Sequence, residues 1–360
     1  MKAAVDLKLP IYFDSDHRSL SIQDKVLTNS ESCLSLLEKE NPSHPFTKTA
    51  KMVKNKAGFR KFLASVYPDY YFRLLSLDDL MTLDKKEIPF PVVVKPNKGY
   101  SSIGVYIVET EQEWENAVKS LYADMLLSAN TYSNAVIDGA EIIIEEWIDG
   151  EEFAVDCYFN DSGKPVILNI LTRTFLNNQD TSDRIYYTSK EIIADIKADI
   201  EEFLQMLSKR MDMKNFPFHL EVRKSSKGVR AIELNPLRFA GAGTTDVSHH
   251  AFDVNGAAYY FTGKEPNWER ILQEGDQSYY GFFCAEIPPS ISQQLIEGID
   301  HDRLRDEFSH VLEYRKIQAN NDRTFAVIFF KTDDLDELQH LLHLDLSQYI
   351  QVNKVQETIL

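Results

Sequence analysis

The sequence contains two strand-like runs, FPFHLEV at residues 216–222 and VRAIELN at 229–235, with the turn sequence KSSKG between them. Alternating runs joined by a short glycine-containing turn are typical of a β-hairpin. With the turn centred near its fourth residue, antiparallel register places Glu221 directly across from Glu233. Asn235 lies two residues further on, so it shares that face of the hairpin. The apolar residues then point the other way, into a core: Leu220, Val222, Ile232 and Leu234.

Two carboxylates at these positions repel each other, because directly opposed Cβ atoms lie about 5 Å apart. A divalent cation removes this conflict, and two glutamates with an amide oxygen form an all-oxygen ligand set suited to Mg²⁺. The residues therefore indicate a magnesium site on Glu221, Glu233 and Asn235. The alternative is a solvent-facing acidic pair, since charged hairpin faces are frequent.

A second feature is the sequence PVVVKPNKGYSSIGVYIV at residues 91–108, in which two β-branched runs flank a polar loop. Lys95 ends a run that should be buried, and the loop offers Ser101, Ser102 and two glycines. Freed backbone amides, hydroxyls and a lysine charge can together hold a phosphate. The Lys and Ser/Thr that complete a P-loop are missing, so this is not a Walker A motif. A surface hairpin with a solvated lysine is the alternative.

The third feature is the run EEWIDGEEF at residues 145–153, where a strand ends through an apolar residue. The backbone N–H and C=O groups exposed by such a run need partners. A flat heteroaromatic ring with a donor and an acceptor on one edge satisfies them, and a nearby carboxylate can accept hydrogen bonds from ribose hydroxyls. An acidic strand–turn–strand without a ligand is the alternative interpretation.

The charge of the chain limits what these features can bind. There are 39 Lys and Arg against 56 Asp and Glu, a net charge of −17 over 360 residues. This field repels nucleic acid and anionic membranes, so an anionic ligand must be held by a local cluster of donors.

The scattered cysteines, Cys33, Cys157 and Cys284, indicate neither a disulfide framework nor a zinc site. No apolar run suggests a signal peptide or a membrane span, so we expect a cytoplasmic protein that binds neither nucleic acid nor membrane.

The remaining patterns suggest how the chain is divided. Residues 1–48 are weakly patterned, and NPSHPF at 41–46 resembles a linker. Helices are predicted over 49–66, 111–126 and 189–211, and strands over 141–148, 151–159 and 165–175. After about residue 256 the composition changes. The sequences YYGFFCAEI, TFAVIFFK and DDLDELQHLL there predict two strands and a helix of a small α+β domain.

Together the three features resemble the ATP-grasp superfamily over roughly residues 50–255. The phosphate-binding strand–loop–strand of the D-alanine–D-alanine ligases is similar to PFPVVVKPNKGYSSIGV. The hinge of those enzymes is similar to EEWIDGEEF, and their metal hairpin, which ends in Glu-x-Asn, is similar to HLEV with AIELNP. The order and spacing of all three agree with that family. The resemblance implies an α+β fold, the ATP-grasp fold, in which two α/β lobes clasp ATP.

The resemblance also implies the domain organisation. We expect a short N-terminal region at 1–48, an ATP-grasp domain at 49–255 with lobes of about 49–145 and 146–255, and a C-terminal α+β domain at 256–360. The family usually begins with a Rossmann-like domain that supplies part of the substrate site. Fewer than about 55 residues precede Lys56, too few for such a domain. We therefore expect a truncated N-terminal region, and a C-terminal region that packs over the substrate side and completes the pocket.

Individual residues receive roles from the resemblance alone. The ATP phosphates would be held by Lys95, Ser101, Ser102 and, as a second lysine, Lys56. Adenine would be held by Glu145, Glu146, Trp147 and Ile148, and ribose by Glu152. The metal ion, Mg²⁺ or Mn²⁺, would be bound by Glu221, Glu233 and Asn235. The candidates to stabilise an acyl phosphate are Arg238, Arg223 and Arg173. Arg238 is favoured, because it resembles the arginine after the Asn-Pro pair in the biotin-carboxylase-like branch.

Two residues depart from the family pattern. Tyr100 makes the phosphate loop bulkier than a glycine-rich loop. His219 occupies a position where the D-alanine ligases carry an arginine.

The implied activity is that of an ATP-dependent carboxylate–amine ligase, which makes an amide or peptide-like bond through an acyl phosphate and releases ADP and phosphate. Its partners would be a small carboxylate and an amine, such as amino acids or peptides, and a homodimer is possible. Because no nucleophilic side chain is needed, Cys157 and the pair His249-His250 are interpreted as packing residues. Two alternatives stay open: an ATP-grasp kinase that phosphorylates a small molecule, and a non-catalytic ATP-binding regulatory protein.

Overall fold

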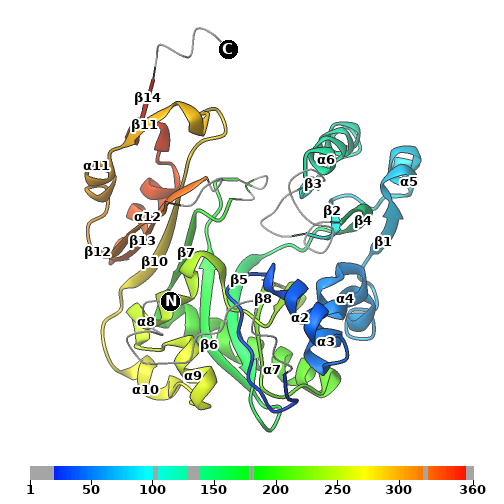
Figure 1. The fold of residues 1–360 in the computed structure, drawn as a ribbon, viewed down its shortest axis with the longest axis horizontal. Coiled ribbons are helices and arrows are strands. Elements are labelled where there is room, and N and C mark those ends of the chain that lie inside the picture. Colours follow the sequence, from blue (N-terminus) through cyan, green and yellow to red (C-terminus); the bar gives the residue numbers. More distant parts are fainter. Residues whose placement is uncertain are drawn as a thin grey trace.

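The computed structural model describes residues 20–99, 104–128, 138–177, 180, 182–318 and 323–353. Two lobes account for most of it (Figure 1). The small lobe has a four-stranded sheet in the order β1-β4-β2-β3, and the large lobe an eight-stranded sheet in the order β12-β13-β10-β7-β6-β5-β8-β9. Strands β11 and β14 form a separate pair. Over these ranges, no helix is long and apolar enough to cross a membrane.

The small lobe is an antiparallel sheet covered on one face by helices. Its strands are β1 (Phe72–Ser76), β2 (Val92–Lys98), β3 (Tyr106–Val108) and β4 (Asp138–Glu146), with α5 (Leu77–Thr82), η1 (Lys85–Glu87) and α6 (Trp114–Ser128). Alternation along β2 buries Val92 and Val94 in a core with Trp114 of α6, and turns Val93 and Lys95 to the other face. The hairpin expected over residues 91–108 is confirmed, since β2 and β3 pair in antiparallel register.

The large lobe continues the same antiparallel pattern. It contains β5 (Glu151–Phe159), β6 (Pro165–Arg173), β7 (Ile185–Thr188), α7 (Lys190–Met211), β8 (Phe216–Ser225) and β9 (Gly228–Pro236), followed by η2 (Gly241–Asp246), α8 (Val247–Phe252), α9 (Gly256–Thr262) and α10 (Trp268–Gln273). Helix α7 begins at Ser189, whose side chain accepts a hydrogen bond from the Ile192 amide. Its buried stripe packs on the sheet: Ile193, Ile196, Ile200, Phe203, Leu204 and Leu207.

The C-terminal strands extend this sheet. They are β10 (Tyr279–Glu286), β12 (Val311–Lys316) and β13 (Thr324–Thr332), and β10 pairs directly with β7. The change of composition near residue 256 is therefore not a boundary between sheets. Around these strands lie η3 (Gln293–Leu295), β11 (Ile296–Ile299), α11 (His301–Arg305), α12 (Leu335–Leu342), η4 (Leu346–Tyr349) and β14 (Ile350–Val352).

The N-terminal region packs against the large lobe. It forms α2 (Cys33–Glu40), α3 (Pro45–Lys54) and α4 (Lys56–Leu63), and α3 lies on β9. The single helix predicted over 49–66 is wrong, because the chain turns at Asn55, whose side chain caps α4 by accepting from the Gly58 amide. Ahead of α2, the Thr28 amide donates to the carbonyl of Leu237 at 2.7 Å. This contact carries the N-terminal segment toward the end of β9.

Candidate active site

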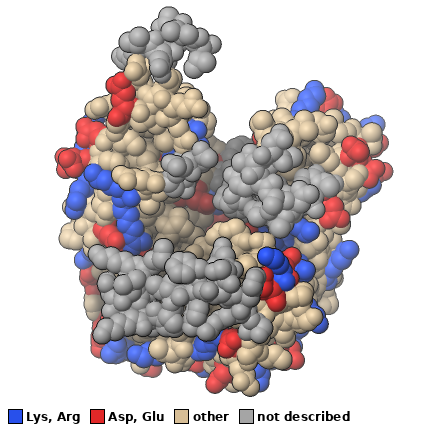
Figure 2. Space-filling view, viewed as in Figure 1, with Lys and Arg blue, Asp and Glu red and all other residues tan. Residues whose placement is uncertain are grey.

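A cavity of about 1010 Å³ lies between the lobes. Its walls come from β2 and β4 of the small lobe, from β8 and β9 of the large lobe, and from the loop after β9. Figure 2 shows the corresponding hollow. Twelve of the expected site residues line it: Lys56, Lys95, Glu145, Glu146, Trp147, Ile148, Glu152, Arg173, Glu221, Arg223, Glu233 and Arg238. Asn235 lies just behind the wall, and Ser101 and Ser102 fall outside the described residues.

The hairpin of β8 and β9 brings the expected carboxylates together. Glu221 and Glu233 are directly paired in its register, as predicted. The Asn235 amide nitrogen donates to both, at 2.9 Å to Glu233 and 3.4 Å to Glu221. The amide oxygen, the atom a cation would need, instead accepts from Lys54 at 3.5 Å. The register is therefore confirmed, while the metal role of Asn235 stays a prediction.

The two carboxyl groups differ in their electrostatic surroundings. Burial, and next the charge of Glu233, raise the pKa of Glu221 well above its usual value. Burial also acts on Glu233, but the charges of Lys56, Lys54 and Lys95 outweigh it and lower the pKa of that carboxyl. The Lys56 ammonium lies 3.3 Å from Glu233. One carboxylate is thus held ionised by lysines, and its partner resists ionisation.

A β-bulge corrects one part of the predicted hairpin. The register shifts after Glu221, so that Val222 pairs with Ala231 and Ile232 is the extra residue. Val222 and Ala231 are in the core, whereas Ile232 lines the cavity. The prediction that Ile232 points into the core is therefore wrong. A bulge breaks the alternation on which that prediction depended.

Lys95 is held by Glu145 at the centre of the small-lobe sheet. Its ammonium lies 2.5 Å from one oxygen of Glu145, and Arg60 donates to the other at 2.7 Å. Only 2% of Glu145 is exposed. Burial disfavours ionisation, but Arg60 and Lys95 outweigh it and lower the pKa of Glu145 to about 2. Because this carboxylate is committed to two cations, the geometry gives no support to the adenine contact expected of it.

The segment after β4 forms the link between the lobes. The Trp147 amide donates to the carbonyl of Pro91 at 3.2 Å, and the Glu146 carbonyl accepts from the Tyr70 hydroxyl. The carbonyl of Ile148 accepts from Arg223 at 2.8 Å. Parts of the backbone expected to meet adenine therefore have partners within the protein. Side chains of this segment still border the cavity.

Two of the expected catalytic arginines hold the carboxylate expected to bind ribose. Arg173 lies 3.0 Å from one oxygen of Glu152, and Arg223 lies 3.0 Å from the other. The Arg223 guanidinium is 5.2 Å from the Trp147 ring centre, and Arg173 is 4.5 Å from that of Phe175. These contacts fix both guanidinium planes beside the cavity. The negative charge of Glu152 offsets part of the positive charge of Arg173 and Arg223.

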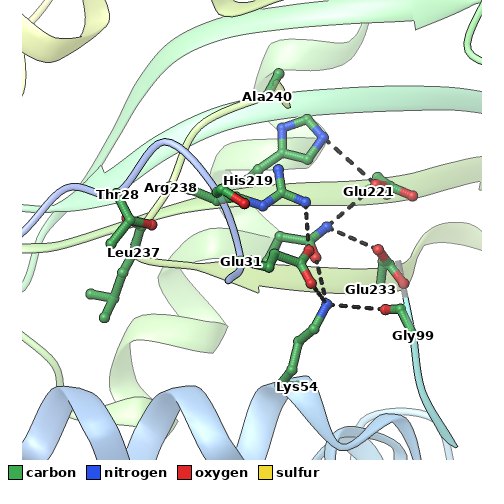
Figure 3. A network of polar contacts seen from close by, with 12 residues as sticks. Thr28, Glu31, Lys54, Gly99, His219, Glu221, Glu233, Leu237, Arg238 and Ala240 are labelled. Atoms are coloured by element: carbon green, nitrogen blue, oxygen red, sulfur yellow. Dashed lines mark hydrogen bonds and ion pairs between the residues drawn. The ribbon is translucent and has the colours of Figure 1, made fainter. Parts of the chain in front are cut away.

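The third arginine, Arg238, pairs with a residue that the sequence analysis missed. Its guanidinium donates to Glu31 at 2.8 Å, and the second oxygen of Glu31 forms an ion pair with Lys54 (Figure 3). Lys54 and Lys56 also donate to the Gly99 carbonyl, at 3.1 and 3.5 Å. The N-terminal region, expected only to be truncated, thus supplies Glu31 to the site, and Lys54 at the end of α3 is a second charged residue that was not expected there.

His219 is oriented by a further residue that no motif indicated. The carboxylate of Asp156 lies 2.8 Å from the His219 Nδ1 and also accepts from the Ala240 amide at 2.8 Å. The other ring nitrogen lies 3.7 Å from Glu221. The Asp156 contacts tie strand β8 to the start of the loop after Arg238. Asp156 precedes Cys157 in an apolar strand, where its inward orientation can be seen only in the paired sheet.

A cavity between two antiparallel lobes, with lysines gathered near a pair of opposed glutamates, is the arrangement expected from the resemblance to the ATP-grasp superfamily. Comparison with protein families agrees, because a family model described as "ATP-grasp domain" matches residues 88–246. The matched residues make up less than half of the chain, and the resemblance to that superfamily is confirmed. The expected fold class is confirmed with it.

Several curated relatives are named as ligases. The L-arginine-specific L-amino acid ligase of Bacillus subtilis is 20% identical over 85% of this chain and 73% of its own length. The D-alanine–D-alanine ligase of Francisella philomiragia is 29% identical over 39% of this chain and 41% of that protein. The expected enzyme class, an ATP-grasp ligase, is confirmed by these relatives, although the match to D-alanine ligases spans only about two fifths of their length.

Solved structures share the fold over most of the chain. The L-amino acid ligase from Bacillus licheniformis superposes with a TM-score of 0.61 and 18% identity, over 92% of this chain and 80% of that one. The ADP complex of N5-carboxyaminoimidazole ribonucleotide synthetase gives a TM-score of 0.57 and 16% identity, over 87% of this chain and 77% of that one. At these identities the likeness concerns the fold.

Proposed function

We propose that this protein is an ATP-dependent carboxylate–amine ligase that forms an amide or peptide-like bond through an acyl phosphate. The observation that carries the proposal is the meeting of cations and opposed carboxylates at one end of the cavity. Lys54, Lys56, Lys95 and Arg238 gather there around the Glu221–Glu233 pair. In a chain with a net charge of −17, such a local cluster of cations suits a polyanionic ligand.

The nucleotide would lie across both lobes. Its phosphates would meet Lys95 and Lys56, together with Ser101 and Ser102 of the phosphate loop. Adenine would lie beside the segment 146–148 and Ile232, with ribose near Glu152. The apolar lining from Val93, Ile148 and Ile232 suits a flat base. A solved structure with the same fold is an ADP complex, which supports a nucleotide in this cavity.

The opposed glutamates fit a divalent cation. Burial, and next the charge of Glu233, raise the pKa of Glu221, and a bound cation would offset both effects. The described residues include no group of three or more His, Cys, Asp or Glu arranged for a metal. A set of two carboxylates is instead typical of Mg²⁺ that phosphates help to hold. Glu221 and Glu233, with Asn235 after reorientation of its amide, would bind Mg²⁺ or Mn²⁺. Bound there, the metal would neutralise charge on the nucleotide phosphates.

The reaction would proceed in two displacements. A carboxylate oxygen of the first substrate attacks the γ-phosphorus of ATP, the bond to the β-phosphate oxygen breaks, and ADP leaves. The amine then attacks the carbonyl carbon of the acyl phosphate. A C–N bond forms, phosphate departs with the former carboxylate oxygen, and the amine loses a proton. The protein's contribution is to hold the reactants in place and to oppose developing negative charge.

Arg238 is the residue best placed for the second of these tasks. It lies beside Lys54 and the opposed glutamates, with its guanidinium held by Glu31. Arg173 and Arg223 share Glu152 and would act nearer the ribose. We therefore assign the acyl phosphate to Arg238, and give Arg173 and Arg223 supporting roles.

The names of the relatives suggest amino acids as substrates, since they include L-amino acid ligases and D-alanine–D-alanine ligases. A homodimer and a cytoplasmic location stay predictions.

A crossed panel tests this proposal. Amino acids and other small carboxylates are paired with amines, and ADP release and product mass are recorded together. A ligase releases ADP only when acid and amine are both present, and yields a product lighter than their sum by one water. ADP release with a single acceptor and a phosphorylated product would indicate a kinase instead. ATP binding without ADP release from any pair would indicate a regulatory protein.

A further inference from the structure

The loop that follows Arg238 borders the cavity and has an unfavourable backbone. Its lining residues are Ala240, Gly241, Ala242 and Thr244. Two consecutive residues are left-handed, with φ of 53° at Ala242 and 86° at Gly243. For a residue with a side chain, such as Ala242, this conformation costs about 1 kcal/mol. The loop therefore needs contacts from elsewhere to keep its shape.

Arg315 of the edge strand β12 provides such contacts. Its Nη1 donates to the carboxylate of Asp246, the last residue of η2, at 2.7 Å. Its Nε and Nη2 donate to the two oxygens of Glu313 at 2.7 and 2.8 Å, and its guanidinium lies 4.5 Å from the ring centre of Phe329. The bidentate hydrogen bond to Glu313 and the contact with the Phe329 ring together fix the guanidinium plane.

The same guanidinium lies against the backbone of the loop. A Cβ built on Gly243 would be 2.7 Å from Nη1 of Arg315, closer than real Cβ contacts allow. The positive φ of Gly243 also favours glycine at this position. Arg315 thus contacts the middle of the loop as well as its end, although it comes 69 residues after Asp246 in the chain.

We propose that Arg315 is a positioning residue that keeps the loop 240–246 in the shape it presents to the carboxylate substrate beside Arg238. This inference rests on the proposed ligase function. Arg315 acts through the loop and through Asp246, and it contacts neither ATP nor substrate. The C-terminal strands would then take part in the reaction by shaping one wall of the cavity.

Two variants and one control test the proposal. Arg315→Ala removes the ion pair with Asp246, the two hydrogen bonds to Glu313 and the contact with the Phe329 ring. Arg315→Lys keeps only the positive charge. Arg303→Ala is the control, because Arg303 also lies over an aromatic ring, Tyr349, but hydrogen-bonds to Gln348. Hydrogen–deuterium exchange is followed in peptides spanning 237–252. The Kd for ATP and the KM and kcat with the best acid are measured in parallel.

We expect Arg315→Ala to speed exchange in the loop about tenfold and to raise the KM for the acid by a similar factor, with the Kd for ATP unchanged. Arg315→Lys should be intermediate, and Arg303→Ala should match the parent protein. Parental exchange and parental KM in Arg315→Ala would overturn the proposal. If the parent protein makes no product with any acid and amine, the ligase function fails, while loop exchange still decides the role of Arg315.

Gly243→Ala provides an independent check. In the parent protein the new methyl group meets Arg315, whereas in Arg315→Ala that neighbour is gone. The effect of Gly243→Ala on loop exchange should therefore be smaller in the Arg315→Ala background, leaving only the cost of the positive φ. Equal effects in both backgrounds would show that the guanidinium does not press on the loop, and would contradict the proposal.

Discussion

Glu221 and Glu233 are paired directly across the β8–β9 hairpin, with the Asn235 amide nitrogen between their carboxylates. Burial, and next Glu233, raise the pKa of Glu221 well above its usual value, so at neutral pH this acid destabilises the apo protein, whose folded state must bind a proton that the unfolded chain releases. Glu221→Gln removes the titrating group and keeps the shape. We expect it to raise the free energy of unfolding of the metal-free protein by about 1 kcal/mol, and to lower turnover at least about 100-fold.

Urea unfolding in EDTA and a steady-state ADP assay measure the two effects. The surface glutamate Glu87, which pairs with Arg73 in an exposed position, offers the matched control Glu87→Gln. Parental turnover in Glu221→Gln would show that Glu221 has no role in the reaction.

Lys95→Ala tests the phosphate site. Lys95 contributes one buried charge-assisted contact, and its removal should weaken ATP binding at least about tenfold. Lys85→Ala is the control, since Lys85 pairs only with the exposed Glu111 and Glu115 among the contacts the structure gives it. Isothermal titration calorimetry with ATP and Mg²⁺ measures both. Equal affinities for Lys95→Ala and the parent protein would remove Lys95 from the nucleotide site.

The buried pairing of Glu145 predicts a pH dependence of stability. The pKa of Glu145 is about 2 in the folded protein and about 4.5 in its unperturbed state. Because the folded-state pKa is lowered, the stabilisation is fully present above pH 4.5 and is lost as the pH falls toward 2. The loss attributable to Glu145 is on the order of 3 kcal/mol.

Urea unfolding between pH 3 and pH 6, in the parent protein and in Glu145→Gln, isolates this contribution. The variant should show a shallower decline in the free energy of unfolding as the pH falls, because other acids still titrate but residue 145 does not. Parallel curves would mean that Glu145 is not held by Lys95 and Arg60 in solution.

Glu31→Gln tests the role of the N-terminal segment. Glu31 is 8% exposed and neutralises Arg238 and Lys54 in the absence of ligand. Its loss leaves two buried cations short of an anion, so the free protein should lose about 3 kcal/mol of stability. ATP should then raise the melting temperature of the variant more than that of the parent. Glu38→Gln, a nearby exposed acid paired with Lys51, is the control. An equal ATP-induced shift in Tm would contradict this role of Glu31.

Much of the site could be predicted from local sequence patterns. The pairing of Glu221 with Glu233 was predicted from a turn centred at residue 227, whereas Ser225 pairs with Gly228 and the bulge at Ile232 restores the predicted pair. Lys95 was predicted from a lysine at the end of a buried strand. Ile232 was misassigned because a bulge leaves no mark in an alternating run. Asn55, which breaks the predicted helix, acts through a local cap that competes with helical hydrogen bonds.

Contacts between distant segments could not be predicted. Glu31 contacts Arg238 and Lys54 only after α3 packs on β9, and no local sequence pattern predicts that packing. The same holds for Arg315, whose partner Asp246 lies in another part of the chain. The composition of the C-terminal strands suggested a separate unit. In the structure β10 pairs with β7, and the sequence alone does not show which strand edges pair.

Transfer of an oxygen isotope from the acid to phosphate tests whether the carboxylate is activated by phosphorylation. The active acid is prepared with ¹⁸O in both carboxylate oxygens and turned over with unlabelled ATP and the amine. The account predicts one ¹⁸O in each phosphate released and one in the amide product, because the carboxylate oxygen that attacks the γ-phosphorus leaves with it. Unlabelled phosphate, with both ¹⁸O atoms kept on the acid, would contradict activation of the carboxylate by phosphorylation.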